Sequence, residues 1–165
     1  MAQALPLPSR VVAGALAGTV ATAPMTAVMR RLHARLERDD QYPLPPREII
    51  GSIAPGLRKD PARDTTIIAH FAYGALCGAA LATALEKPTA AAGAASGVGI
   101  WLASYLGWIP ALGILRPASR HPAPRNALMI LAHVAWGSAY ALAQSELVKS
   151  RSIFEGRPLK DIEIG

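Results

Sequence analysis

Long apolar runs alternate with short polar segments along this chain of 165 residues. The apolar runs lie at about 10–29, 65–85, 90–115 and 126–148. Each is close to the roughly 20 residues that a helix needs to cross about 30 Å of hydrocarbon. Polar residues gather in a loop at 30–64, a second loop at 116–125 and a tail at 149–165. The pattern predicts a single membrane domain, an all-α integral membrane protein with four transmembrane helices.

Proline and charge modify this simple pattern. Pro24 lies inside the first run and Pro110 inside the third. Membrane helices tolerate proline, which kinks their axis. We expect the first helix to continue over 30–38 as a basic amphipathic extension. Within the long loop, a turn-rich stretch at 39–46 precedes a short helix that proline opens at about 46–54.

Two stretches within the apolar runs are nearly the same. Residues 69–75 read AHFAYGA and residues 132–138 read AHVAWGS, with four of seven positions identical. We call these the twin segments. They predict a duplicated helical hairpin. Because each hairpin has two helices, both cross the membrane in the same sense, as a parallel repeat about the membrane normal. The two histidines are then expected at similar depth.

Small residues recur at four-residue spacing in every run. In membranes, helices associate by close packing rather than by hydrophobic exclusion, and small residues permit that approach. One alternative is that the spacing reflects only the abundance of alanine and of the 14 glycines. We interpret the spaced residues as helix-packing positions: Gly14, Gly18, Gly74, Gly78, Gly93, Gly97, Gly137 and Ala141.

His70 and His133 are the ionisable residues of the twin segments. Such a residue inside a membrane is a functional hypothesis by default, because exposing it to lipid is costly. One reading is a cofactor-binding pair for haem b, with a glycine one turn away to admit the flat ring. A second, which we favour, is that each neutral imidazole hydrogen-bonds a carbonyl or hydroxyl across the bundle, with no cofactor. A proton or quinone role is the third.

The net charge of +6 changes the expected partners. The basic residues flank apolar runs, so we expect contact with the lipid bilayer and not with nucleic acid. Eleven of the 17 Lys and Arg residues lie in the loops 30–64 and 116–125. The positive-inside rule then predicts that both loops are cytoplasmic and both termini outside, in a bacterial plasma membrane. Cys77 is the only cysteine, so no intramolecular disulfide is expected.

No catalytic motif accompanies these features. The chain has no HExxH, no CxxC, no phosphate-binding loop and no plausible Ser-His-Asp arrangement. We expect no catalytic residues and no metal site, and we interpret the chain as a non-enzyme. The first hypothesis is an accessory or structural subunit that associates with itself or with other membrane subunits through its small-residue faces. The alternatives are a small transporter or channel, and a haem- or quinone-binding electron carrier.

The chain resembles the YagU-type family of small bacterial inner-membrane proteins. The resemblance covers about residues 10–145 and rests on the segments 14–18, 24–26, 44–49, 70–74, 105–110 and 133–137. It implies an inner-membrane location and a link to acid tolerance. The family is largely uncharacterised and supplies no catalytic residues to carry over.

Overall fold

A computed structural model describes residues 6–154 of the chain. This part is helical and contains no strand. Its long helices are α1 (Leu7–His33), α3 (Lys59–Ala84), α4 (Ala90–Leu102) and α6 (Ala123–Phe154). The shorter elements are η1 (Arg38–Asp40), α2 (Pro45–Ile53), the π-helical η2 (Ala103–Trp108), α5 (Ile109–Ala111) and η3 (Ala118–Arg120). Four stretches are long and apolar enough to cross a membrane, which confirms the expected all-helical architecture with four candidate spans.

The polar segments are shorter than the sequence pattern predicts. α3 begins at Lys59, within the expected loop 30–64, because Asp60 in its first turn suits the positive end of the helix dipole and Pro61 is tolerated there. α1 ends at His33, so the expected extension over 30–38 is not helical throughout. α6 continues to Phe154, beyond the expected start of the tail 149–165. Residues 155–165 of that tail lie outside the described residues.

The third span is irregular just before its proline. α4 passes into the π-helical η2, and Gly107 there has the non-helical angles φ −106° and ψ −109°. Pro110 lacks an N–H and its ring conflicts with the carbonyl four residues earlier, which accounts for the irregular turn. Helical structure stops at Ala111, short of the expected 115. Gly113 follows with φ +68°, a conformation that glycine adopts without strain. Pro24, by contrast, lies within an uninterrupted α1.

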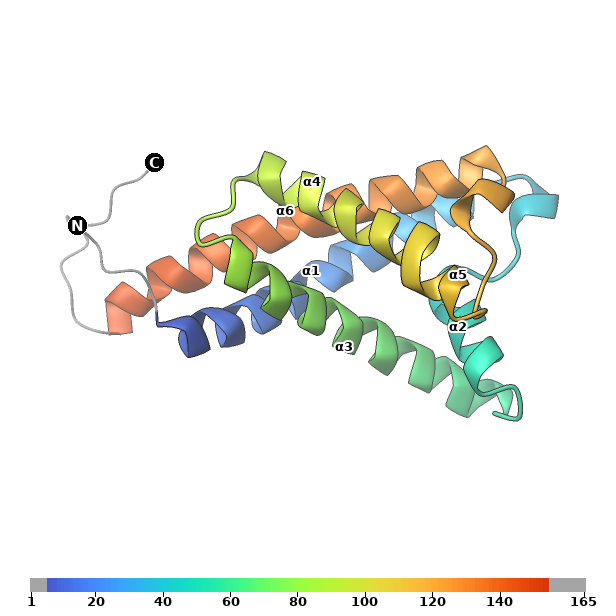
Figure 1. Cartoon of the computed structure of the whole chain (residues 1–165), viewed down its shortest axis with the longest axis horizontal. Coiled ribbons are helices and arrows are strands. Elements are labelled where there is room, and N and C mark those ends of the chain that lie inside the picture. Colours follow the sequence, from blue (N-terminus) through green and yellow to red (C-terminus); the bar gives the residue numbers. More distant parts are fainter. Residues whose placement is uncertain (1–5, 155–165) are drawn as a thin grey trace.

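α1 and α6 form the centre of the bundle (Figure 1). α1 packs along α3 and along α6, and α4 packs along α6. α3 and α4 make no comparable contact in the part of the chain that the structure describes. Figure 1 shows α3 diverging from α1 and α6 toward the end of the bundle where α2 lies. The bundle is therefore closed on one side and splayed on the other.

Within each hairpin, the two helices meet along a line of small residues, which we call a seam. In the seam between α1 and α3, a Cβ added at Gly18 would overlap the carbonyl oxygen of Gly74, and one at Gly14 would meet that of Gly78. In the seam between α4 and α6, Gly93 lies against the Gly137 carbonyl and would also bring a Cβ to 2.9 Å from that of Ala141. The structure places all eight predicted packing residues in these two seams.

The second seam is displaced by one helical turn relative to the first. Gly18 lies against Gly74, whereas Gly97 lies against the His133 carbonyl, one turn before Gly137. Gly74 and Gly137 hold the same position in the twin segments. One helical turn is about 5.4 Å. The two hairpins thus use the same kind of contact in different registers.

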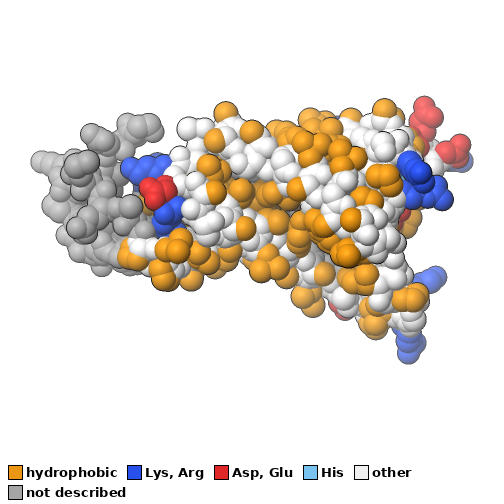
Figure 2. Space-filling view, viewed as in Figure 1, with side chains coloured by type: hydrophobic (Ala, Val, Ile, Leu, Met, Phe, Trp, Pro, Cys, Tyr) orange, Lys and Arg blue, Asp and Glu red, His pale blue; other side chains and the backbone are white. Residues whose placement is uncertain are grey.

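Apolar side chains cover the outside of the helices. Figure 2 shows hydrophobic side chains along the body of the molecule and charged ones at its two ends. Hydrocarbon, not water, suits such a surface, because an exposed apolar band between charged ends matches a bilayer cross-section. The exposed residues of this band include Val12, Leu16, Val20, Ile68, Leu76, Leu131 and Leu142.

Candidate functional site: a cavity between the hairpins

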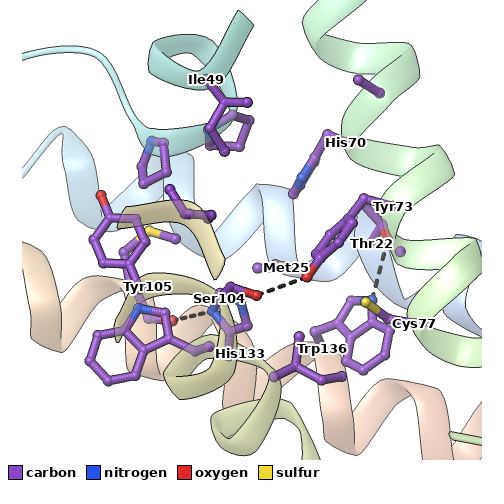
Figure 3. A pocket seen from close by; sticks show the side chains of 18 of the residues that line it. Thr22, Met25, Ile49, His70, Tyr73, Cys77, Ser104, Tyr105, His133 and Trp136 are labelled. Atoms are coloured by element: carbon purple, nitrogen blue, oxygen red, sulfur yellow. Dashed lines mark hydrogen bonds between the residues drawn. The ribbon is translucent and has the colours of Figure 1, made fainter. Parts of the chain in front are cut away.

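A cavity of about 240 Å³ lies on the splayed side of the bundle (Figure 3). α3 supplies one wall, and α4 with η2 supplies the facing wall. α2 covers it from the loop end, and α1 and α6 lie behind it. The walls are mostly apolar, with Ile49, Met25 and Trp136 among them. Both predicted histidines, His70 and His133, line this one cavity.

The two histidines differ in their hydrogen bonds. His133 is buried, and its Nδ1 lies 2.7 Å from the Met129 carbonyl oxygen one turn earlier. Because a carbonyl oxygen only accepts, Nδ1 carries the hydrogen, which leaves Nε2 of the neutral ring as an acceptor. The predicted bond across the bundle is therefore a bond within α6. His70 is half-buried and points from α3 into the cavity, as Figure 3 shows. Its Nε2 is buried and has no partner among the described residues.

A polar link spans the gap between α3 and η2. The Tyr73 hydroxyl lies 2.8 Å from Ser104 Oγ, and Trp108 Nε1 donates to the same Oγ at 3.3 Å. Tyr73 is 38% exposed and Trp108 41% exposed, so this link lies at the outer edge of the cavity. The π-helical turn presents Ser104 and Trp108 to α3 here. Only side chains join the two walls at this edge.

The wall behind the cavity is closed by donors from α6. Trp136 Nε1 donates to the Gly18 carbonyl at 3.2 Å and to Thr22 Oγ1 at 3.3 Å. One turn on, the Tyr140 hydroxyl donates to the Gly78 carbonyl at 3.2 Å. The two rings stack, with centroids 5.5 Å apart and planes 9° apart. α6 is thereby fixed to both helices of the first hairpin.

Arg125 anchors the segment that leads into α2. This residue is 2% exposed and donates to the carbonyls of Asp40, Tyr42 and Pro43 at 2.8–3.0 Å. Its guanidinium carbon lies 3.3 Å from the centre of the Tyr42 ring, a cation–π contact. Its Nη2 also lies 3.6 Å from Glu48 Oε2 on α2. α2 is thus tied to the start of α6, and its isoleucines cover the cavity.

His121 completes this anchor. Its Nε2 donates to the Arg116 carbonyl at 3.3 Å, so its Nδ1, 2.8 Å from the Tyr42 hydroxyl, accepts from that hydroxyl in the neutral ring. Burial raises the pKa of the Glu48 carboxyl, while the nearby Arg125 and His121 act in the opposite direction. Burial likewise raises the pKa of the Tyr42 hydroxyl, against the effect of Arg125.

The cavity lining is mostly apolar, with a few polar atoms. Apart from the two histidines, the described residues around the cavity include no acidic or basic side chain. No group of three His, Cys, Asp or Glu within the described part of the chain is arranged to hold a metal ion. Cys77 lines the cavity beside a wall that is largely apolar. The arrangement can hold a lipid-soluble molecule and offer it a few hydrogen bonds.

Sequence reasoning missed several of these residues. The apolar run at 90–115 does not single out Trp101, Ser104 or Trp108, and Arg125 counts only as one of the basic residues of the loop 116–125. Pro110 was the available signal for η2, since the turn before a membrane proline is where a helix loosens. No local signal marks Arg125, because its partners lie more than 80 residues away along the chain.

Comparisons with protein-family models, with curated proteins and with solved structures find no match to this chain. The resemblance to the YagU-type family therefore stays a prediction.

Proposed function

We propose that this protein binds a small lipid-soluble molecule in the cavity between its hairpins. The observation that carries the proposal is the buried Nε2 of His70, which has no partner among the described residues and belongs to a ring pointing into an apolar cavity. A buried polar group without a partner costs about 1–3 kcal/mol. A ligand that offers a hydrogen bond would remove that cost.

The cavity volume suits a ligand whose buried part is about one ring. An engineered cavity of about 150 Å³ in another protein is known to take benzene. At about 240 Å³, this cavity accommodates a single six-membered ring with several small substituents. A chain attached to the ring has a way out past Tyr73 and Trp108, which are partly exposed. The volume gives no support to haem b, whose macrocycle joins four rings in one plane.

The accessory-subunit hypothesis gains nothing from the packing. It rested on small-residue faces, and Gly14, Gly18, Gly93 and Gly97 are all in contact within this chain. Association with itself or with other subunits would have to use a different surface. The transporter alternative stays a prediction, and ligand binding is a step that it would share.

We further propose that the two hairpins descend from one ancestral hairpin. The twin segments and the two glycine seams support this. So does a reciprocal contact: the aromatic residue of each twin segment hydrogen-bonds the first span of the other hairpin, Trp136 with Thr22 and Tyr73 with Ser104. We attribute the one-turn displacement of the second seam to later divergence.

We propose a cytoplasmic position for the loops 30–64 and 116–125, in a bacterial plasma membrane. The support is the concentration of Lys and Arg in these loops. In a Cys77→Ser background, Arg120→Cys should react with a membrane-impermeant maleimide only after the cells are broken. Reaction in intact cells would reverse the orientation.

Tryptophan fluorescence tests the binding proposal, because all three tryptophans of the chain line the cavity. Bromobenzene, a one-ring apolar quencher, should quench the protein saturably in lipid nanodiscs. Ala69→Phe fills the cavity from α3 and should abolish the saturable part. Ala72→Phe is the matched control, since Ala72 lies on the same helix, is exposed and does not line the cavity. Identical quenching of both variants and the wild type would refute the proposal.

A further inference from the structure

We infer that the ligand is a ring that carries carbonyl or hydroxyl oxygens on opposite sides, as a quinone or its quinol does. This inference rests on the proposed function, because it assigns a chemical class to the molecule in the same cavity. It depends on which hydrogen-bonding atoms of the lining are already used and which remain.

Trp101 supplies a donor without an acceptor. It lies on α4, is 6% exposed and lines the cavity. Its Nε1 is buried and has no partner among the described residues. An indole N–H can only donate. The group that satisfies it must therefore be an acceptor, and a carbonyl oxygen is the simplest neutral one.

The opposite wall supplies the second contact. His70 comes from α3, and its unpartnered Nε2 donates or accepts according to which nitrogen carries the hydrogen. Trp101 and His70 thus belong to facing walls of the cavity, one on α4 and the other on α3. A molecule that satisfies both needs polar atoms at two separated points of an apolar body. This requirement excludes a plain hydrocarbon and a single-headed alcohol.

His133 extends the fit to the reduced form of the ring. Its Nδ1–H is occupied by the Met129 carbonyl, so its Nε2 is available only as an acceptor. A quinol hydroxyl can donate to such a nitrogen, and a quinone carbonyl cannot. The lining therefore holds a donor, an acceptor and a group able to act as either. Among the described residues, no carboxylate, lysine or arginine side chain lines the cavity to favour a charged ligand.

The test compares two rings of equal size. Duroquinone and durene are both tetramethyl-substituted six-membered rings, and only the first carries oxygens. Binding is measured in lipid nanodiscs by thermal shift and by competition with bromobenzene, with each concentration expressed as a mole fraction in the lipid. Two added hydrogen bonds should make duroquinone bind roughly tenfold more tightly than durene.

Variants assign that preference to the named atoms. His70→Leu and Trp101→Phe remove a hydrogen-bonding atom and keep an apolar side chain, so each should lower the preference severalfold and leave durene binding intact. His70→Gln keeps a hydrogen-bond donor and should therefore retain part of the preference for duroquinone over durene. Thr83→Val is the control, since it removes a hydroxyl at the other end of α3 and Thr83 is not among the lining residues.

The outcomes separate the two proposals. Equal binding of both rings, or a preference unchanged by His70→Leu and Trp101→Phe, overturns the quinone inference while the cavity remains a binding site. Absence of saturable binding for both rings and for bromobenzene overturns the proposed function itself.

Discussion

Each side of the bundle carries one twin segment, but the two surroundings differ. One side is closed by direct contact between helices, and the other is splayed around a cavity. On the closed side, Trp136 of one twin segment donates to the backbone of α1, and the helices lie in direct contact. On the splayed side, Tyr73 of the other segment reaches only the Ser104 side chain, across a cavity. Corresponding positions of the twin segments thus lie at a packed interface in one place and beside a cavity in the other.

The difference originates in the helix that each aromatic residue meets. α1 is continuous through Pro24 and presents its backbone to α6. The third span loosens into η2 before Pro110, so it presents side chains instead of a regular helix face. α2 then covers the loop end of the gap with apolar side chains. The irregular turn at η2 thus contributes to a cavity at a position where a regular helix face is absent.

The largest effect is expected when a large side chain replaces a glycine in the seam between α1 and α3. Gly18→Leu places a branched side chain against the Gly74 backbone, which cannot move aside, and should cost about 3 kcal/mol or more. Gly99→Leu is the control, because a side chain there meets nothing within 4 Å. Size-exclusion chromatography and circular dichroism in mild detergent should show loss of the folded species for the first variant alone. A well-folded Gly18→Leu protein would break the comparison.

Removing the anchor of α2 should have the next largest effect. Arg125→Ala leaves three loop carbonyls without their donor and breaks a buried ion pair, a loss of about 3 kcal/mol. Arg125→Lys keeps the charge but lacks the planar guanidinium, so its stability should lie between those of the wild type and of Arg125→Ala. Hydrogen exchange should increase over 39–53, and the exposed Arg120→Ala should leave it unchanged. Unchanged exchange in Arg125→Ala would mean that the cover of the cavity is held by other contacts.

A matched pair of substitutions compares the two sides directly. Trp136→Phe removes a buried donor to the Gly18 carbonyl and should lower the free energy of unfolding by about 1 kcal/mol. Tyr73→Phe removes a partly exposed hydroxyl and should cost about half as much. Trp108→Phe removes an indole on the exposed edge together with its 3.3 Å hydrogen bond to Ser104 Oγ, and should cost less than Trp136→Phe. Equilibrium unfolding in SDS–detergent mixtures measures all three, and equal costs would contradict the distinction between the sides.

The smallest expected effect is a pH dependence at Glu48. Burial raises the pKa of this carboxyl above its ordinary value of 4.5, so the folded protein favours the protonated form. The corresponding stability is fully present below the unfolded pKa and is lost as pH rises through the folded pKa. Glu48→Gln should therefore raise the melting temperature slightly at neutral pH and leave it unchanged near about pH 4. A lower melting temperature at neutral pH would show that the Arg125 ion pair outweighs the burial.

The architecture was predictable because it depends on local patterns. Runs of about 20 apolar residues specify spanning helices, and glycines four apart specify where they touch. The twin segments predict a similar depth for His70 and His133, but not that the two side chains line one cavity. The cavity itself did not follow, since it depends on the loosened turn at Ser104 and on Arg125 holding residues 40–43 from across the chain. Such long-range contacts leave no periodic signal in the sequence.

The carbonyl of Gly18 has a consequence for how the protein unfolds. It accepts from the Thr22 hydroxyl and from Trp136, and it lies in the seam with Gly74. Three helices therefore share one backbone group. Separating α6 from α1 alters the same carbonyl that packs against α3. The effects of substitutions at Gly74 and Trp136 on the free energy of unfolding should therefore not be additive, although the two residues lie on different helices. We therefore expect α1, α3 and α6 to unfold as one cooperative unit, which α4 joins mainly through its packing against α6.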